Sequence, residues 1–380
     1  MMLRRLLVIG FLLAYLPVFG SGQVRVRLFS DADADLALFA ADSGRYEVNT
    51  FSDSSFEIAP GELVIISRYG NRIYLKARNR EGMICDSLFF SGKSGNESFS
   101  LRIKGIRRFY SGDLHCYPDL GSLVLINICD IETYIAGVVK AEGGPGKNIE
   151  YFKTQAVIAR TYMYRYFDKH VTDRFNLCDI THCQAFNGIS GDTVINRAAL
   201  ETKGEVILGP DSTLIIAAFH SNCGGETAPS ESVWLTNEPY LKKVTDPFCT
   251  SSRNARWQTS MSREAWTGYL EKMGYKGDKN NPSLLNFSQK TRMAEIKAGA
   301  FSIPLGQVRT DLNLRSAFFS ITASGDSVLF NGRGYGHGVG LCQEGAMSMA
   351  MKGFDYRQII NFYYAGVVLA DIKEAKSEEK

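Results

Sequence analysis

The period of the hydrophobic pattern changes from two residues to about 3.6 near Asp130, and this change constrains the fold more than any other feature. From residue 24 to 108 apolar and polar residues alternate, as in Glu62-Leu-Val-Ile-Ile and Ser100-Leu-Arg-Ile-Lys. Gly, Asp and Asn separate the runs, which is typical of strands with one buried face. We therefore expect a small β domain over residues 23–108.

Two consecutive helices are expected beyond a hairpin at residues 110–127. Asp130 is a favourable N-cap, and Gly143-Gly144-Pro145 ends the first helix. The second helix is expected over residues 149–167, with Arg160 roughly 60° from the middle of its apolar stripe. The first helix has apolar residues at the spacing of one buried face: Ile131, Tyr134, Ile135, Val138 and Val139.

The rest of the chain mixes both patterns. The sequence predicts an α+β fold, in which the small β domain is followed by a mixed α/β domain over residues 109–370. Residues 371–380 form a charged tail that we expect to be disordered. Further helices are expected at residues 195–202, 263–273, 344–352 and 355–363, and further strands at residues 205–208 and 214–220.

The first 22 residues have the pattern of a secretory signal peptide. Arg4 and Arg5 precede an apolar run over residues 6–19, and Gly20-Ser-Gly22 supplies small residues for cleavage. The alternative is a membrane anchor, but this run is shorter than the ~20 residues that span a bilayer. No later stretch is long and apolar enough to span one. We expect an exported protein of the periplasm or cell envelope without a stable membrane span.

Charge and cysteine content narrow the partners and the chemistry. Lys and Arg total 43 and Asp and Glu total 40, which gives no support for nucleic-acid binding. All eight cysteines lie beyond the signal, and an even number in an exported protein permits disulfides. The spacings fix no pairing, so some thiols could be free or metal-bound.

Glu142 is the candidate catalytic residue, because it lies where the first helix ends. The partial negative charge of a helix C-terminus disfavours a carboxylate, and partial burial would act in the same direction by raising its pKa. A carboxylic acid that stays protonated near neutral pH suits a general acid for glycosidic cleavage. The alternative is an ordinary solvated glutamate.

Arg160 leans toward the core and needs an acceptor, because buried charges are paired. Glu142 is one candidate, but a close Arg–Glu pair would lower the pKa of the acid. Arg160 could instead hold substrate, or contact Gln155 and backbone carbonyls. The sequence leaves these alternatives open.

Glu142 has no second carboxylate at a motif position, whereas an ordinary glycosidase uses two. One acid suffices if the attacking hydroxyl belongs to the substrate. Peptidoglycan provides this case, since the 6-hydroxyl of N-acetylmuramic acid can attack its own anomeric carbon and give a 1,6-anhydro sugar.

Seven separated motifs follow one another along the chain: Tyr134-Ile-Ala-Gly-Val-Val-Lys-Ala-Glu142, residues 153–162, Cys178-Asp-Ile-Thr-His-Cys-Gln184, residues 217–225, Pro239-Tyr-Leu241, Leu312-Asn-Leu-Arg-Ser316 and residues 332–346. Together these motifs resemble the SpoIID/LytB family. Two departures stand out. The acid of the family is usually followed by Met-Pro, where this chain has Gly143-Gly144-Pro145, and Cys342 replaces the usual Ser before Gln343.

The resemblance implies a lytic transglycosylase acting on peptidoglycan glycan strands in a substrate groove. Glu142 then matches the catalytic acid of the family, and Gln155 and Arg160 match the polar pair of its second helix. LytB proteins are described as amidase enhancers. A non-enzymatic wall-binding protein that activates a cell-wall amidase is therefore the alternative.

The segment with Cys178, His182 and Cys183 could bind one zinc ion with a fourth ligand, such as His170 or water. Adjacent His182 and Cys183 would be unusual ligands for one ion, because neighbours in a strand point apart. Disulfides, for example with Cys223, and plain packing are the alternatives. Because the family resemblance includes this segment, we favour a structural zinc ion.

Three further residues are candidates for substrate binding. His337 lies in the glycine-rich segment of residues 332–346, where glycines let the chain pass close to backbone or sugar. It could bond to substrate or orient Glu142, and a structural histidine is the alternative. Tyr240 and Lys242 could line the groove, although core packing and a solvated charge explain them equally well.

A third function would be a cysteine enzyme that uses Cys183 or Cys342 with His220 or His337. It would require a thiol of low pKa. No cysteine-peptidase or transpeptidase signature surrounds any of these residues.

Overall fold

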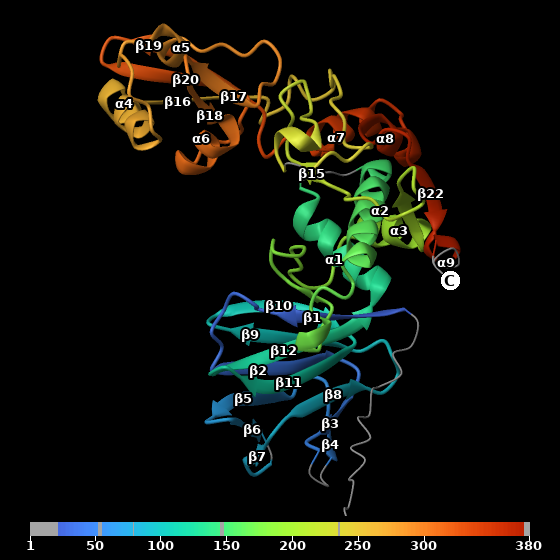
Figure 1. Ribbon diagram of the computed structural model, residues 1–380. Helices are drawn as coiled ribbons and strands as arrows, with labels where there is room; N and C mark the ends of the chain where they lie inside the picture. The colour runs from blue at the N-terminus through green and yellow to red at the C-terminus, as the bar shows by residue number, and fades with distance from the viewer. Residues whose placement is uncertain (1–21, 52–54, 79, 145–147, 235, 376–380) are drawn as a thin grey trace, which may run out of the picture.

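The computed structural model describes residues 22–51, 55–78, 80–144, 148–234 and 236–375. Apart from Gly22, the expected signal peptide lies outside them. The fold is α+β, as predicted, with a β-sandwich, a central helical region and an outer module (Figure 1). Within the described ranges, no helix has the length and apolar character needed to cross a bilayer.

The sandwich consists of two mainly antiparallel sheets that pack face to face. Between them, the ring centroids of Phe39 and Phe90, one from each sheet, lie 4.3 Å apart. One sheet has the order β13(Leu177–Cys178), β1(Gln23–Leu28), β12(Ser122–Asp130), β11(Asp113–Asp119), β8(Leu88–Gly92), β3(Tyr46–Asn49), β4(Ser55–Ile58). The other has the order β10(Ile106–Ser111), β9(Ser98–Ile103), β2(Leu36–Ser43), β5(Leu63–Tyr69), β6(Arg72–Ala77), β7(Met83–Cys85). Alternate residues of β1 are buried, as its sequence pattern predicts.

The sandwich continues past residue 108, where the sequence placed a domain boundary. β10 pairs with β9, and β11 and β12 form the predicted hairpin inside the larger sheet. β12 also pairs with β1, with Val24 opposite Cys129. Because these strands bury their apolar faces against the N-terminal sheets, the sandwich extends to Asp130.

The central region is built around α1(Ile131–Glu142), α2(Ile149–Arg165) and α3(Thr193–Glu201). Asp130 caps α1, as predicted, because its carboxylate accepts hydrogen bonds from the backbone N–H groups of Glu132 and Thr133. Around these helices lie η1(Val171–Asp173), β14(Glu205–Leu208), β15(Phe219–His220), η2(Ser230–Ser232), β21(Leu341–Cys342), α7(Gln343–Met351), α8(Tyr356–Tyr363), β22(Val368–Asp371) and α9(Ile372–Ala375).

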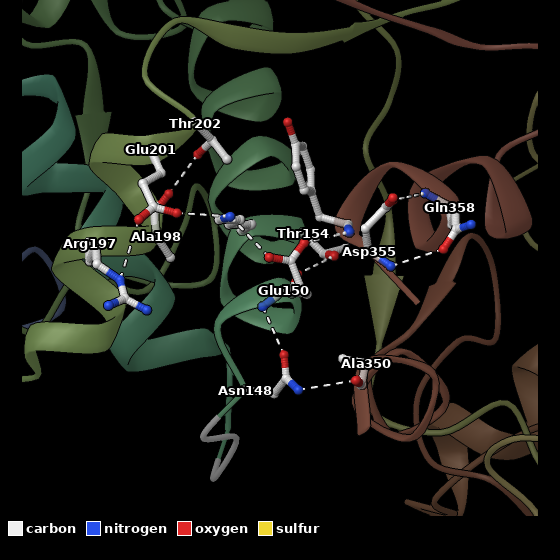
Figure 2. Close-up of polar contacts among 12 residues, drawn as sticks. Asn148, Glu150, Thr154, Arg197, Ala198, Glu201, Thr202, Ala350, Asp355 and Gln358 are labelled. Carbon is white, nitrogen blue, oxygen red and sulfur yellow. Dashed lines mark hydrogen bonds and ion pairs between the residues drawn. The ribbon is translucent and has the colours of Figure 1, made fainter. Parts of the chain in front are cut away.

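Polar contacts at the start of α2 fix this helix against α7 and α8 (Figure 2). Asn148 Nδ2 donates to the carbonyl of Ala350 at 3.1 Å, and Glu150 accepts from the backbone N–H of Tyr356 at 3.0 Å. Lys153 forms ion pairs with Glu150 and with Glu201 on α3. α2 is therefore held on two sides, which matters because it carries Gln155 and Arg160.

The outer module, residues 256–333, has a hydrophobic core of its own around Trp266 and Phe330. It contains β16(Arg256–Ser262), α4(Arg263–Lys272), α5(Pro282–Leu285), β17(Glu295–Ala298), β18(Phe301–Pro304), α6(Leu305–Asp311), β19(Phe319–Ser324) and β20(Ser327–Arg333). The helix expected at residues 263–273 is confirmed as α4, whereas a separate module with its own core was not predicted.

The end of the chain corrects one prediction. Residues 371–375 are ordered, whereas a disordered tail was expected from residue 371. β22 pairs with β14, with Asp371 opposite Glu205, and Ile372 is buried against Val206 and Leu208. Residues 376–380 lie outside the described part of the chain.

Candidate functional site

Glu142 is the last residue of α1, and its side chain is partly buried. Its Oε1 accepts a hydrogen bond from the backbone N–H of Ala185 at 2.7 Å. Burial raises the pKa of Glu142, and the Ala185 N–H bond offsets part of this effect because it favours the carboxylate. The direction expected from the sequence is therefore present, with burial as its main cause.

Gln343, at the start of α7, connects Glu142 with Gln155. Its Nε2 donates to the backbone carbonyl of Glu142 at 2.8 Å and to Oε1 of Gln155 at 3.3 Å. Gln155 is buried, and its own Nε2 has no hydrogen-bond partner among the described residues. The structure thus brings Gln155 close to Glu142, through a residue that the sequence interpretation had not singled out.

The end of α1 is held by backbone contacts. Tyr151 donates its hydroxyl hydrogen to the carbonyl of Gly143, and Gly143 N–H bonds to the carbonyl of Val139. Gly144 follows with φ +68°, a conformation that glycine adopts without a steric penalty. Pro145, the predicted stop, lies outside the described residues.

Arg160 does not contact Glu142. Its side chain is fully buried, and its guanidinium pairs with both carboxylate oxygens of Glu132 in the first turn of α1. The remaining donors reach the carbonyls of Ala199 and Glu205. A saturated, solvent-inaccessible guanidinium has no donor to offer a sugar, so the structure assigns Arg160 to the packing of α1, α2 and α3.

The sequence does contain a signal that Glu132 pairs with Arg160, although the sequence interpretation did not use it. Glu132 precedes Ile135 by three residues and Val139 by seven, so it lies on the apolar stripe of α1. A charged residue on that stripe needs a buried counter-ion, and Arg160 lies on the corresponding face of α2.

The predicted cysteine–histidine group is brought together. One ligand atom from each of His170, Cys178, His182 and Cys183 lies within 4.8 Å of all the others. Cys178 Sγ is 3.5 Å from His182 Nδ1, and Cys183 Sγ is 3.5 Å from His170 Nε2. His182 and Cys183 lie in a turn rather than a strand, so neighbouring side chains can point to the same place.

A carboxylate contacts the ring nitrogen of His170 that faces away from the thiols, as is usual for metal-binding histidines. Its Nδ1 lies 3.1 Å from a carboxylate oxygen of Asp173, and its ring stacks on Phe175 with centroids 4.7 Å apart. This contact directs Nε2 toward the thiols.

The loop that contains this cluster also contacts Glu142, because Ala185 follows Cys183 by two residues. Asp179 fixes the same loop to the sandwich: it accepts from the backbone N–H groups of Phe29 and Ser30 and pairs with Arg108 at 2.9 Å. The sequence interpretation had given Asp179 no role.

A disulfide between Cys223 and Cys178 or Cys183 would require these residues to be neighbours, but Cys223 lies elsewhere. It lies beside Cys249 and Cys342. All eight cysteines are free thiols in the structure.

Tyr240 and Lys242 do not contact Glu142. Tyr240 is buried, and its hydroxyl accepts from the backbone N–H of Ile216 at 3.0 Å. Lys242 is exposed. For Tyr240 the structure therefore supports core packing.

His337 is a neutral, partly buried histidine. Its Nδ1 accepts from the backbone N–H of Val339 at 3.0 Å, and burial lowers its pKa to about 4. Its ring lies between buried His220, 5.5 Å away, and partly exposed Trp234, 5.3 Å away. No contact in the described part of the chain joins His337 to Glu142, so direct orientation of the acid by His337 is not what the structure shows.

Comparison with known families adds independent information. The sequence profile of the SpoIID family, described as Stage II sporulation protein, matches residues 119–208, which contain Glu142, Gln155 and the cysteine–histidine cluster. Over that segment the chain is similar to the SpoIID family. The resemblance expected from the sequence motifs is thereby confirmed.

Three relatives illustrate the range of similarity. Stage II sporulation protein D of Bacillus subtilis is 27% identical over 259 residues, 63% of this chain and 74% of that protein. The amidase enhancer of the same organism is 27% identical over 291 residues, 62% of this chain but only 40% of that protein. An uncharacterised protein of Brachyspira hyodysenteriae is 29% identical over 314 residues, 81% of this chain and 83% of that protein.

Proposed function

We propose that this protein cleaves peptidoglycan glycan strands as an exported lytic transglycosylase of the cell envelope. The observation that carries the proposal is the position of Glu142. It is a partly buried acid of raised pKa at a helix end, held by a single backbone N–H, inside the segment that matches the family.

The reaction needs one acid that also serves as a base. Protonated Glu142 donates its proton to the glycosidic oxygen between N-acetylmuramic acid and N-acetylglucosamine as that bond breaks. The resulting carboxylate then accepts the proton of the muramic acid 6-hydroxyl while this oxygen bonds to the anomeric carbon. The products are a free N-acetylglucosamine hydroxyl and a 1,6-anhydro sugar, and Glu142 regains its proton.

Neighbouring groups position this acid. The Ala185 N–H orients the carboxylate, and Gln343 fixes the backbone of Glu142. The free Nε2 donor of Gln155 is a candidate for substrate contact, and exposed Trp234 and Tyr335 offer rings for sugar stacking near His337. Lys242 remains a candidate at the surface.

The four ligands of the cysteine–histidine cluster fit zinc. Two thiols and two imidazoles form a usual structural set, and Asp173 orients one imidazole. Bound zinc would cross-link the loop that presents Ala185 to Glu142. Because the ligand set leaves no open position for water, we assign zinc a structural and not a catalytic part.

The experiment is mass spectrometry of the products formed from purified peptidoglycan. We expect 1,6-anhydro ends, and a loss of at least ~100-fold in their rate of release with Glu142→Gln, because a general acid is removed. Glu231→Gln, at an exposed position, is the matched control and should keep full activity.

Two results would overturn the assignment. Full activity of Glu142→Gln would remove the proposed acid. A reducing end that contains oxygen from water would indicate hydrolysis and a separate base among Glu226, Asp246 and Glu344. Each of these is already engaged: Glu226 by Thr291, Glu344 by Asn222, and Asp246 by Tyr363.

The alternative function is enhancement of an amidase, which is the printed name of one relative. The same digest separates the two. A protein that releases no anhydro product but accelerates an added cell-wall amidase on intact walls would be an enhancer and a partner of that amidase. A cysteine enzyme receives less support, since Cys342 is fully buried and burial raises the pKa of its thiol.

A further inference from the structure

A second group of potential metal ligands lies away from the cysteine–histidine cluster. It consists of Cys223, Asp246, Cys249 and Cys342, whose ligand atoms all lie within 4.8 Å of one another. Cys223 Sγ is 3.3 Å from Cys249 Sγ and 3.2 Å from Asp246 Oδ2. For comparison, Zn–S bonds of ~2.3 Å in a tetrahedron place sulfur atoms ~3.8 Å apart.

All four side chains have zero exposed surface. A buried carboxylate beside three thiols is costly unless something compensates its charge. Asp246 receives a hydrogen bond from the hydroxyl of Tyr363 at 2.9 Å and one from the backbone N–H of Phe248 at 2.8 Å. These contacts leave Asp246 Oδ2 directed at Cys223 and fix it in the group.

Backbone N–H donors and a cation lie beside the sulfur atoms of this group. Cys342 is the N-cap of α7, and its Sγ accepts from the backbone N–H groups of Cys223 at 3.2 Å and Gly345 at 3.4 Å. The positive end of a helix favours an anion such as a thiolate. Arg292 adds a cation, because its Nη2 donates to the carbonyl of Cys223 at 2.7 Å.

We infer that Cys223, Asp246, Cys249 and Cys342 form a second zinc site, which binds a closed tetrahedral structural ion. Three thiolates and one carboxylate fill the four positions of zinc, and binding releases the three thiol protons. Arg292 and the N-terminus of α7 offset the excess negative charge. The inference is independent of the reaction proposed for Glu142.

The site would join three distant parts of the chain. Cys223 follows β15, Cys249 precedes the outer module, and Cys342 ends β21, directly before Gln343. β15 and β21 are paired over two residues only, Phe219 with Leu341 and His220 with Cys342. An ion that bridges Cys223, just after β15, and Cys342, at the end of β21, would hold these short strands together and so fix the position of Gln343.

Metal analysis of the full chain, purified without reductant or chelator, tests the inference. With both clusters occupied we expect two zinc ions per chain. Cys342→Ser should lower the affinity of the second site for zinc. The loss should exceed the ~10–100-fold loss of affinity that follows removal of an outer hydrogen-bond partner. Cys178→Ser is the matched control, since it should affect only the other ion. A zinc content that Cys342→Ser leaves unchanged would overturn the second site.

Two measurements keep the test decisive if a variant folds poorly. Cobalt added to the metal-free Cys178→Ser chain should give sulfur-to-metal charge-transfer absorption from the second cluster, and the double variant Cys178→Ser with Cys342→Ser should lose most of it. Peptide mapping after alkylation in denaturant should find Cys223, Cys249 and Cys342 all alkylated. A disulfide between Cys223 and Cys249 in the wild-type chain, or an adventitious metal with no sulfur charge transfer, would contradict the zinc site.

Discussion

The protonation of Glu142 determines both activity and stability as pH changes. Its pKa in the folded chain lies above the ordinary value of 4.5, and burial is the main cause. The acid step needs the protonated form, so we expect the rate of anhydro-product release to fall as pH rises through this raised pKa. A pH–rate profile of the wild-type chain measures it. A rate that rises over this range would contradict Glu142 as the acid.

The same shift predicts a pH-dependent difference in stability. Below the pKa that Glu142 has in the unfolded chain, the residue is protonated in both the folded and unfolded states, and its contribution to the free energy of unfolding is fully present. As pH rises through the folded pKa, the buried carboxylate forms and that contribution is lost. Glu142→Gln has no such charge, so its melting temperature relative to wild type should increase from pH 4 to pH 8. A constant difference would mean that burial does not perturb Glu142.

Arg160 has a different role from the one its matching position in the family motif implies. Breaking a buried ion pair leaves an uncompensated charge, so Arg160→Ala should lower the free energy of unfolding by about 3–5 kcal/mol. Arg357→Ala, which removes a half-exposed partner of Glu205, should cost about 0–1 kcal/mol. Urea denaturation measures both. A stable Arg160→Ala with weaker substrate binding would restore a role in binding.

At the scale of elements, helices are predicted well where a cap and an apolar stripe coincide. The N-cap Asp130 and the apolar stripe of α1 predict where the helix begins and ends, and Glu142 is its last residue. β15 is not predictable in the same way: a strand was expected from residue 214, but apart from an isolated bridge at Leu214 only Phe219–His220 forms a strand. Its partner β21 lies far along the chain, and local periodicity carries no information on such a pairing.

The cysteine–histidine loop gives a prediction at this scale. His182→Ala should lose the first zinc ion, and chelation should lower the melting temperature together with activity, because the ion braces the loop that contacts Glu142. Elemental analysis and thermal denaturation measure these effects. A chelator that stops the reaction with the melting temperature unchanged would contradict a structural ion.

At the scale of the whole molecule, the chain has two main cores. One runs continuously from the sandwich through the central helices, and the other lies wholly inside residues 257–330. The sequence placed a boundary at residue 108, inside the sandwich, and did not predict the outer module, because the core of that module draws on short strands and helices with no long periodic stretch. The expected substrate groove stays a prediction.

Separate cores imply separate responses to mutation. Trp266 is fully buried, and its indole N–H bonds to the carbonyl of Leu284. Trp266→Ala should destabilise the outer module by about 3–5 kcal/mol. Hydrogen exchange should then accelerate within residues 256–333 while α1 and α2 keep their protection. Trp234→Ala, at a partly exposed position, is the control. Equal acceleration throughout the chain would show that the two cores unfold as one.

The contact between Gln343 and the carbonyl of Glu142 spans 201 positions in sequence. A ribosome that makes the chain from its N-terminus produces α1 and α2 long before Gln343 exists. The acid and the segment that positions it meet only after the chain has been made as far as Gln343. A nascent chain that stops before Gln343 therefore carries the acid without its completed setting, and the order of synthesis itself keeps the candidate site unassembled until Gln343 has been made.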